Sequence, residues 1–250
     1  MIDWHCHILP GLDDGPSDPE QSLTMAGLLS QAGFSTVYCT PHMMRGRFEA
    51  SNDQVLQGVK QLQQTITRHG IPLVLLPGRE YYLDERLPEI LQDPLPLGDS
   101  RLLLIEIPST IFAETAGQLL YGIVRSGFTP VIAHPERCPL LEPALQRTER
   151  RSIWSSLRRL LHVQGQPQEK QHFPSESTGN PLLEYLRDLG CAFQGDLGSF
   201  NGLYGQRART AAETLRRLNV FDRYGSDLHF PLQAKSILKK DGYGSAPAST

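Results

Sequence analysis

The chain has 250 residues, with 24 Lys+Arg against 27 Asp+Glu and a formal net charge of −3. Hydrophobic residues make up 39% of it and charged residues 20%, a composition that supports a buried core and excludes a chain that is disordered throughout or a membrane bundle. The apolar runs are too short to span a bilayer, and the nearly balanced charge without a basic block argues against nucleic-acid binding. We therefore expect one domain of ordinary size, or two small ones, without membrane insertion and without a nucleic-acid partner.

The amino terminus, M-I-D-W-H-C-H, lacks the basic segment followed by an apolar one that marks a secretory signal. A cytoplasmic location is therefore expected by default. The cysteines at positions 6, 39, 138 and 191 contain no C-x-x-C pair, so we interpret them as reduced, mostly buried thiols.

Short apolar runs alternate with longer amphipathic stretches along the chain. The apolar runs predict seven strands, over residues 1–5, 35–40, 72–76, 102–107, 130–133, 191–194 and 221–226. The amphipathic stretches predict helices over residues 19–32, 52–69, 113–125, 181–189 and 206–218. This alternation is typical of a βα-repeat fold with a parallel sheet.

One interval breaks the repeat. Most strand starts are roughly 30 residues apart, the length of a βαβ unit, but the step from residue 130 to residue 191 is about twice that. Residues 149–162 predict an extra helix, and residues 163–180, rich in Gln, Ser, Gly, Pro and Lys, predict a flexible surface loop. We interpret the segment near 150–178 as an insertion into a single domain over residues 1–240, followed by a disordered tail over residues 241–250.

Side chains that can bind metal ions fall at or just beyond the carboxyl ends of the predicted strands. They are His5, His7, His42, Glu80, Glu106, His134, Asp227 and His229. In a closed parallel βα barrel these ends converge on one face, so the separate motifs are expected to form one cluster. Neutral imidazole and carboxylate bind zinc, manganese and iron, and a carboxylate can bridge two ions. Each histidine alone is typical of a core or loop residue, but jointly they predict a metal site.

The segment G-L-D-D-G-P follows the first predicted strand and carries Asp13 and Asp14 in a turn bounded by glycines. Aspartate and glycine in such a turn are typical of a cap for the helix that begins near Pro19. Asp14 could equally be a further metal ligand, and we favour this interpretation because His5 and His7 lie six to nine residues upstream of the two aspartates. Which aspartate is the ligand stays open.

Residues 39–45, C-T-P-H-M-M-R, match the C-x5-R signature of cysteine-dependent phosphatases. In those enzymes the backbone N–H groups of the loop bind phosphate, and a helix amino terminus lowers the pKa of the thiol. Here Pro41 has no N–H, the segment has no glycine, and Cys39 lies in an apolar run where a buried thiol is expected. We therefore interpret the match as accidental.

Six blocks of the sequence resemble the PHP (polymerase and histidinol phosphatase) superfamily of metal-dependent phosphoesterases. The closest resemblance is to the bacterial protein-tyrosine phosphatases of capsule and exopolysaccharide operons, the CpsB/YwqE type. The blocks are D-W-H-C-H-I-L-P-G-L-D-D-G-P from Asp3, T-P-H from Thr40, G-R-E from Gly78, I-E-I-P from Ile105, V-I-A-H-P-E-R from Val131 and S-D-L-H from Ser226. The first and fifth are the most specific to this branch.

The resemblance implies a distorted seven-stranded (β/α)7 barrel that holds three divalent ions, with manganese as the first choice and iron, zinc, cobalt or magnesium as alternatives. The implied ligands are His5, His7, Asp14, His42, Glu80, Glu106, His134, Asp227 and His229, and all nine positions are filled. It also implies hydrolysis of phosphotyrosine on a protein, with a bacterial tyrosine kinase that controls polysaccharide synthesis as substrate and partner. The alternatives are a small-molecule phosphatase of the histidinol-phosphatase kind, or a catalytically weak regulatory partner of a polysaccharide-export kinase.

Hydrolysis of a phosphate monoester needs a strong nucleophile and neutralised phosphoryl oxygens, and clustered metal ions supply both. We assign orientation of the phosphate to Arg137 through a bidentate contact, with a surface salt bridge as the alternative role, and we count His42 and Asp14 as catalytic with it. Two departures from the family pattern stand out. Asp196 replaces the Asn of most relatives, and the arginine-containing segment and closing helix expected after S-D-x-H are missing, which leaves Lys235 as a weak substitute.

Overall fold

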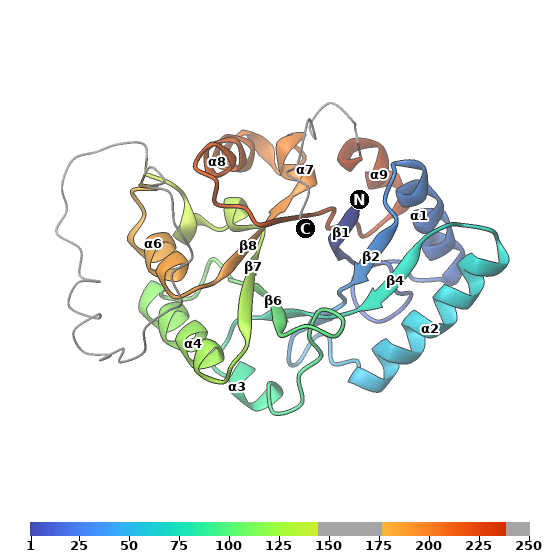
Figure 1. Ribbon diagram of the computed structural model, residues 1–250, viewed down its shortest axis with the longest axis horizontal. Helices are drawn as coiled ribbons and strands as arrows, with labels where there is room; N and C mark the ends of the chain where they lie inside the picture. The colour runs from blue at the N-terminus through green and yellow to red at the C-terminus, as the bar shows by residue number, and fades with distance from the viewer. Residues whose placement is uncertain (145–176, 239–250) are drawn as a thin grey trace.

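Parallel strands lie in the middle of the protein and helices surround them, as a computed structural model describes for residues 1–144 and 177–238 (Figure 1). The strands are β1 (Ile2–Cys6), β2 (Thr36–Cys39), β3 (His42–Met43), β4 (Val74–Pro77), β5 (Glu80–Tyr82), β6 (Leu102–Glu106), β7 (Thr129–Ala133), β8 (Ala192–Asp196) and β9 (Arg223–Gly225). The helices are α1 (Pro19–Gln31), α2 (Asn52–Arg68), α3 (Leu87–Ile90), α4 (Ala113–Arg125), α6 (Pro181–Asp188), α7 (Leu197–Phe200), α8 (Gly205–Arg217) and α9 (Pro231–Ile237), with the 3-10 helices η1 (Pro135–Arg137) and η2 (Pro139–Leu141).

The strands form two parallel sheets, in the orders β1-β2-β4 and β3-β5-β6-β7-β8-β9. Only two residues separate β2 from β3, and only two separate β4 from β5, so each break lies within one stretch of chain. On the other side, the N–H of Asp227 donates to the carbonyl of His5 at 2.8 Å, and the N–H of His7 donates to the carbonyl of Leu228 at 3.1 Å. The two sheets are therefore linked in two places. One is the pair of short connections from β2 to β3 and from β4 to β5, and the other is the hydrogen bonding between β1 and the chain after β9.

All seven predicted strands overlap an observed strand, but the part of the chain that the structure describes contains nine. The prediction of seven separate strands was wrong for the second and third runs, because each continues into a further short strand. Pro41 lies in the first break and has no N–H for a ladder hydrogen bond. Gly78 lies in the second break, and a Cβ there would come within 2.6 Å of the Leu97 side chain.

The five predicted helices are observed as α1, α2, α4, α6 and α8, and the short helices α3, α7 and α9 were not predicted. The expectation that no closing helix follows S-D-L-H was wrong, since α9 begins at Pro231, a residue suited to the first helical turn. The predicted helix over residues 149–162, residues 163–176 of the predicted loop and the tail 241–250 lie outside the described residues.

The last residues of the predicted loop are part of a helix start rather than flexible surface. Thr178 is buried, and its N–H and hydroxyl donate to the Glu184 carboxylate at 2.6 and 2.8 Å. Asn180 caps α6 by accepting from the N–H of Leu183 at 3.0 Å. Thr178 and Asn180 therefore form an ordered entry to α6.

Helix α2 shows how local sequence and packing agree. Ser51 and Gln54 form a reciprocal capping box, which satisfies two of the free N–H groups at the start of the helix. Its buried residues recur at helical spacing, at Val55, Val59, Leu62 and Ile66. This apolar face packs in a hydrophobic cluster with β1, β2, β4 and α1, while a second cluster joins β6, β7 and β8 to α4 and α6.

All four cysteines are buried and free of disulfides, as predicted. Among the described residues, no helix combines the length and the apolar character needed to cross a membrane.

Candidate metal centre

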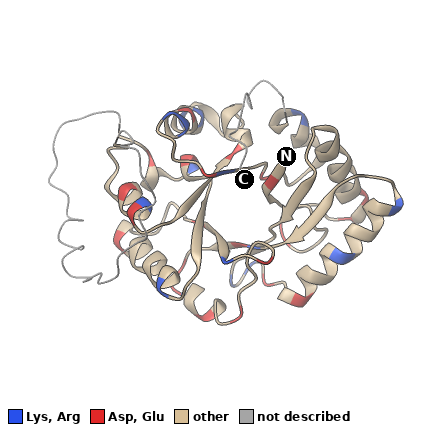
Figure 2. Ribbon diagram, in the orientation of Figure 1, with Lys and Arg blue, Asp and Glu red and all other residues tan. Residues whose placement is uncertain are grey.

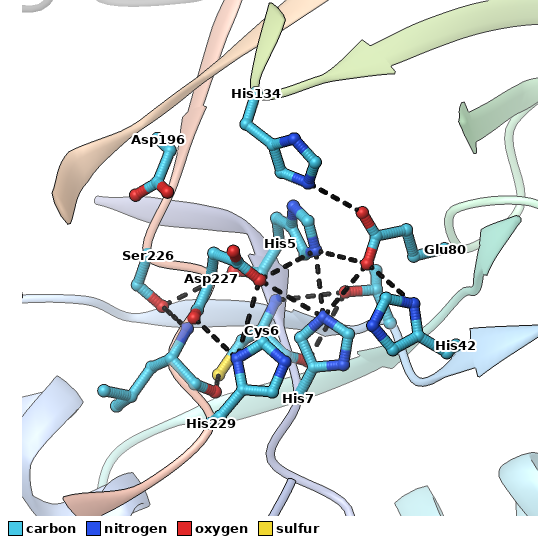
Figure 3. Close-up of polar contacts among 12 residues, drawn as sticks. His5, Cys6, His7, His42, Glu80, His134, Asp196, Ser226, Asp227 and His229 are labelled. Atoms are coloured by element: carbon cyan, nitrogen blue, oxygen red, sulfur yellow. Dashed lines mark hydrogen bonds and ion pairs between the residues drawn. The ribbon is translucent and has the colours of Figure 1, made fainter. Parts of the chain in front are cut away.

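Imidazoles and carboxylates from separate strand ends converge at one place in the structure (Figure 3). His5 lies in β1 and His7 follows it, His42 begins β3, Glu80 begins β5, Glu106 ends β6, His134 follows β7, and Asp227 and His229 follow β9. The prediction that separate motifs form one cluster is therefore confirmed in its geometry.

Glu80 lies at the centre of the cluster. Its Oε2 atom is 3.1 Å from His5 Nε2, 3.2 Å from His7 Nε2 and 3.1 Å from His42 Nδ1, and its Oε1 atom is 2.9 Å from His134 Nε2. Although three imidazole nitrogens lie this close, Oε2 is buried without a hydrogen-bond partner. Since buried polar atoms are otherwise almost always paired, this oxygen suits a carboxylate that bridges cations.

The protons of His5 and His7 are held away from the centre. Nδ1 of His5 is 2.9 Å from Oε1 of Gln194, and Nδ1 of His7 is 2.6 Å from Oδ2 of Asp13. An acceptor at Nδ1 places the proton of the neutral ring there, so the Nε2 atom carries a lone pair. When neutral, both imidazoles therefore direct lone pairs to the space between them.

Positive charge, from imidazole protons or from a bound cation, is required among these nitrogen and oxygen atoms. The two Nε2 atoms of His5 and His7 are 3.0 Å apart, and both lie 3.3 Å from the Asp227 carboxylate. Lone pairs and carboxylates at such distances repel one another unless positive charge lies among them, and neutral imidazole with carboxylate is a typical donor set for divalent metals. The residues present therefore fit a metal ion.

Three groups of side chains bring donor atoms within 4.8 Å of one another and could each hold an ion. They are His5, His7, Glu80 and Asp227; His7, Asp14, His42 and His229; and His42, Glu80 and Glu106. Eight of the nine expected ligands belong to these groups, and the ninth, His134, contacts Glu80 directly. The sharing of His7, His42 and Glu80 between groups is typical of a polynuclear site.

Asp13 and Asp14 have different positions, which separates the roles left open by the sequence. Asp14 is 43% exposed at its side chain, and its Oδ1 lies 3.6 Å from His42 Nε2 and 3.4 Å from His229 Nε2. Asp13 contacts the outer nitrogen of His7 and accepts from the N–H of His42 at 3.0 Å. Asp14 therefore faces the donor groups, while Asp13 orients them from behind. Neither caps α1, since its cap is Asp18.

Burial and charge shift the pKa values of the cluster in opposite directions. Burial alone would lower the pKa of His5, but Glu80 and Asp227 outweigh it and raise the value to about 9. Burial would raise the pKa of Glu80, but the imidazoles, His5 first, hold it well below its usual range. Burial and the neighbouring Glu80 raise the pKa of Glu106 to about 7. In the metal-free cluster, protons on imidazole thus offset carboxylate charge.

Arg137 reaches the cluster because the backbone turns sharply after β7. His134 has a φ of 33°, a left-handed conformation that is uncommon outside glycine, and it leads directly into η1, which ends at Arg137. The Arg137 guanidinium donates to Asp227 and, at 3.1 Å, to Oδ2 of Asp196, and it lies 4.2 Å from the centre of the Tyr204 ring. Both carboxylates are buried, so the surface-salt-bridge interpretation does not describe this arginine.

Three positioning residues were missed by the sequence reasoning. Gln194 and Tyr204 carry no charge, so nothing in the sequence distinguishes them from other polar residues. Asp3 accepts from the N–H groups of Ser226 at 2.8 Å and of His5 at 3.2 Å, which fastens β1 to the end of β9. A carboxylate inside a short apolar run could have signalled this role, since unpaired charges are rarely buried.

The interpretation of the C-x5-R match as accidental agrees with the structure. The Cys39 side chain is fully buried and burial raises the pKa of its thiol, so the nucleophilic thiolate is disfavoured. Arg45, the last residue of the signature, forms an exposed ion pair with Glu89 at 3.3 Å. Lys235, the weak substitute for the missing arginine, is exposed in the last turn of α9.

The amino-acid sequence is similar to those of tyrosine-protein phosphatases from bacteria. YwqE of Bacillus subtilis (strain 168), a tyrosine-protein phosphatase, is 31% identical over 231 residues, which cover 92% of this chain and 77% of YwqE. CpsB of Streptococcus pneumoniae, also a tyrosine-protein phosphatase, is 33% identical over 144 residues, or 57% of this chain and 59% of CpsB.

The structural comparison agrees with these similarities. One of the crystal structures of YwqE from Bacillus subtilis and CpsB from Streptococcus pneumoniae, described as unique metal-dependent tyrosine phosphatases, matches with a TM-score of 0.71 and 30% identity. The match covers 98% of this chain and 88% of that one. Residues 1–152 also match the family described as "Capsular polysaccharide synthesis, CpsB/CapC". The chain therefore belongs to the CpsB/CapC family.

Proposed function

We propose that this protein is a metal-dependent phosphomonoester hydrolase that removes phosphate from phosphotyrosine on proteins. The observation that carries the proposal is the convergence of imidazoles and carboxylates on the unpartnered, buried Oε2 of Glu80. Family membership and the 31% identity to YwqE give the substrate class.

We infer that three divalent ions are held by His5, His7, Asp14, His42, Glu80, Glu106, His134, Asp227 and His229, with manganese as the first candidate. When bound, such ions supply a nucleophile from water at neutral pH and neutralise charge on the phosphoryl oxygens. The proposed part of Asp14 and His42 in catalysis is to complete this centre. Interactions that lower the pKa of Asp14, first its hydrogen bond with His229, keep it a carboxylate near pH 7.

Arg137 is the proposed phosphate-orienting residue. Burial alone would lower its pKa, but Asp227 and Asp196 outweigh this and raise it, so the guanidinium keeps its charge. Five N–H donors in a planar fork allow it to bind two phosphoryl oxygens while Asp196 and Tyr204 still fix its position. Two features support this role: the ring contact with Tyr204 and the proximity to Asp227 of the cluster.

The finer architecture is also a proposal. We infer that the two linked sheets close into one distorted seven-stranded barrel. In this barrel β2 and β3 together count as one interrupted strand, and so do β4 and β5. The hydrogen bonds between the β1 and β9 ends support closure. A single domain over residues 1–240 with an insertion near 150–178, a cytoplasmic location and a polysaccharide-synthesis tyrosine kinase as partner remain expectations.

The proposed function is tested by elemental analysis of purified protein together with hydrolysis of a phosphotyrosine peptide. We expect bound divalent metal, turnover that chelation abolishes and added manganese restores, and full activity in Cys39→Ser. Histidinol phosphate serves as the competing substrate. Turnover of histidinol phosphate alone, or a well-folded, metal-containing Cys39→Ser variant without activity, would contradict the proposal.

A further inference from the structure

A tight hairpin over residues 44–48 follows β3 at the edge of the candidate metal centre. The N–H of Phe48 donates to the carbonyl of Met44 at 2.8 Å, and the N–H of Met44 donates to the carbonyl of Phe48 at 2.9 Å. Gly46 has a φ of 83°, a left-handed conformation that glycine adopts without strain. The hairpin therefore fixes the backbone at Arg45 and Arg47, the residues on either side of this glycine.

The buried Arg79 guanidinium anchors the chain on both sides of the hairpin. Its Nε donates to Oδ1 of Asn52 at 2.9 Å, one terminal nitrogen donates to the carbonyl of Ala50, and the other donates to the carbonyl of His42 at 3.5 Å. Since a guanidinium is planar and rigid, these contacts hold the hairpin against the sheet.

The hairpin places Arg47 above a stack of rings that leads to the centre. The Phe48 ring lies 5.4 Å from the His42 ring, with 11° between their planes, and the Arg47 guanidinium carbon lies 4.8 Å from the centre of the Phe48 ring. The two separations limit that carbon to about 10 Å from the His42 ring centre. A cation over an aromatic face is held there by the ring quadrupole.

Arg47 is the arginine of this hairpin that faces solvent without an acidic partner. Arg45 pairs with Glu89 at 3.3 Å, and the Glu49 carboxylate accepts from the N–H of Gly46 at 2.8 Å. Within the described part of the chain, no ion pair under 4.0 Å joins Arg47 to a carboxylate. Acidic and basic residues are otherwise interspersed over the helices (Figure 2). A positive charge is thus free at the rim of the site.

We propose that Arg47 recognises a carboxylate of the protein substrate, from an aspartate or glutamate one or two positions from the phosphotyrosine. This inference rests on the proposed phosphatase function and names the kind of sequence that it prefers. An extended peptide advances roughly 3.3 to 3.6 Å per residue, so a glutamate at such a position can span the separation between the centre and Arg47. Because the hairpin is fixed by Arg79, the charge is in place before the peptide binds.

The test compares two phosphotyrosine peptides of equal length. One has glutamate at the two positions before and the two positions after the phosphotyrosine, and the other has glutamine at the same positions. The parent protein should hydrolyse the acidic peptide with a kcat/KM about two- to fivefold higher, the range of a partly exposed ion pair. This ratio should shrink as salt is added, since salt screens exposed charges. In Arg47→Gln the ratio should fall to about one.

Arg125→Gln is the matched control. Arg125 is also exposed, but it ends α4 just before β7 begins, so it lies near the amino ends of the strands, opposite the candidate centre. The same charge is removed there, and the ratio should remain that of the parent. A parent-like ratio in Arg47→Gln would overturn the inference, as would an equal drop in both variants.

A binding measurement separates this inference from the proposed function. The same two peptides, labelled with a fluorophore and carrying a non-hydrolysable phosphonate, are titrated with metal-loaded protein and followed by anisotropy. We expect tighter binding of the acidic peptide by the parent and by Arg125→Gln, and equal binding of both peptides by Arg47→Gln. Absence of turnover on both phosphopeptides would refute the proposed function, whereas equal binding of both phosphonates by the parent would refute the role of Arg47.

Discussion

Two adjacent aspartates in the first loop act on the candidate centre from different sides. Asp14 faces His42 and His229, whereas Asp13 contacts His7 at the nitrogen that points away from the cluster. The carboxylate of Asp13 therefore sets the proton position on the proposed ligand His7 from outside the cluster. Such outer contacts affect metal affinity because they orient the imidazole and raise its basicity.

Asp13→Asn should weaken metal binding by about 10- to 100-fold, the usual effect of losing an outer contact to a ligand histidine. The amide removes the negative charge that favours a proton on His7 Nδ1, while it keeps the size of the side chain. Metal affinity is measured by competition with a chelator of known strength, and Asp53→Asn, an exposed change in the first turn of α2, serves as control. Parent-like affinity in Asp13→Asn would remove Asp13 from the centre.

Arg137→Ala should lower kcat by a factor that corresponds to about 2 to 4 kcal/mol, the loss expected for a contact that strengthens in the transition state. Arg137→Lys should recover only part of it, because an ammonium cannot reproduce the planar fork. Both variants should retain metal, which elemental analysis checks. Unchanged kinetics in the alanine variant would leave Arg137 as a purely structural partner of Asp196 and Asp227.

At the scale of single residues, the sequence identifies most of the site but not its supports. Histidine and carboxylate at strand ends are recognisable by chemistry and position, so His5, His7 and Glu80 were predicted together. Gln194 was not, because a neutral amide within a strand has no distinctive signal until its neighbour is known. The position of Arg137 near Asp196 depends on the left-handed turn at His134, which local sequence does not announce.

Among the elements, the breaks between β2 and β3 and between β4 and β5 have the largest influence on the site. Each break is two residues long, and the strand that follows begins with a side chain of the cluster, His42 or Glu80. Strand existence was predictable from apolar runs, but the breaks depend on Pro41 and on the close packing at Gly78. Helices α1, α2, α4, α6 and α8 were predictable because their apolar residues recur at helical spacing.

Arg79→Lys should loosen the segment after β3 and lower the free energy of unfolding by about 2 to 3 kcal/mol. The reason is that an ammonium cannot satisfy the carbonyls of Ala50 and His42 and the side chain of Asn52 together, and hydrogen bonds to a buried charged group are worth about 1.5 to 3 kcal/mol each. Urea unfolding measures the change. Arg125→Lys at an exposed position should stay within about 0.5 kcal/mol of the parent, as surface substitutions do.

For the whole molecule, the cluster couples folding, pH and metal binding. In the metal-free protein Glu80 and Asp227 raise the pKa of His5 to about 9, and Asp13 raises that of His7 well above its usual value, while burial and Asp227 raise the pKa of Asp196 to about 8. A histidine whose pKa is raised on folding stabilises the protein below its unfolded pKa and loses this contribution as pH passes the folded value. A carboxyl whose pKa is raised on folding lowers the stability as pH rises from its unfolded pKa to its folded pKa, because the unfolded chain ionises first. Both effects act in the same direction.

The midpoint temperature of thermal unfolding of the metal-free protein should therefore decrease as the pH is raised from about 7 to about 9. Metal affinity should rise over the same interval, because imidazole must lose its proton to bind. With saturating manganese the fall should be smaller or reversed, since a ligand that binds only the folded state stabilises it. Thermal unfolding from pH 6 to pH 9.5, with and without metal, checks this. A metal-free midpoint that rises across the interval would contradict the assigned protonation states.

The pairing of β1 with the end of β9 also sets the time at which the centre can exist during synthesis. His7 and His229 lie 222 positions apart in the chain, and their rings stack with centres 4.0 Å apart. At a synthesis rate of 5 to 20 residues per second, roughly 10 to 45 seconds separate the appearance of the two residues. Until then the nascent chain carries His5 and His7 without Asp227 and His229, so two of the three candidate donor groups are incomplete. The groups that contain Asp227 or His229 are therefore completed only after the segment beyond β9 has been made and folded, and metal uptake at these groups would report on that step.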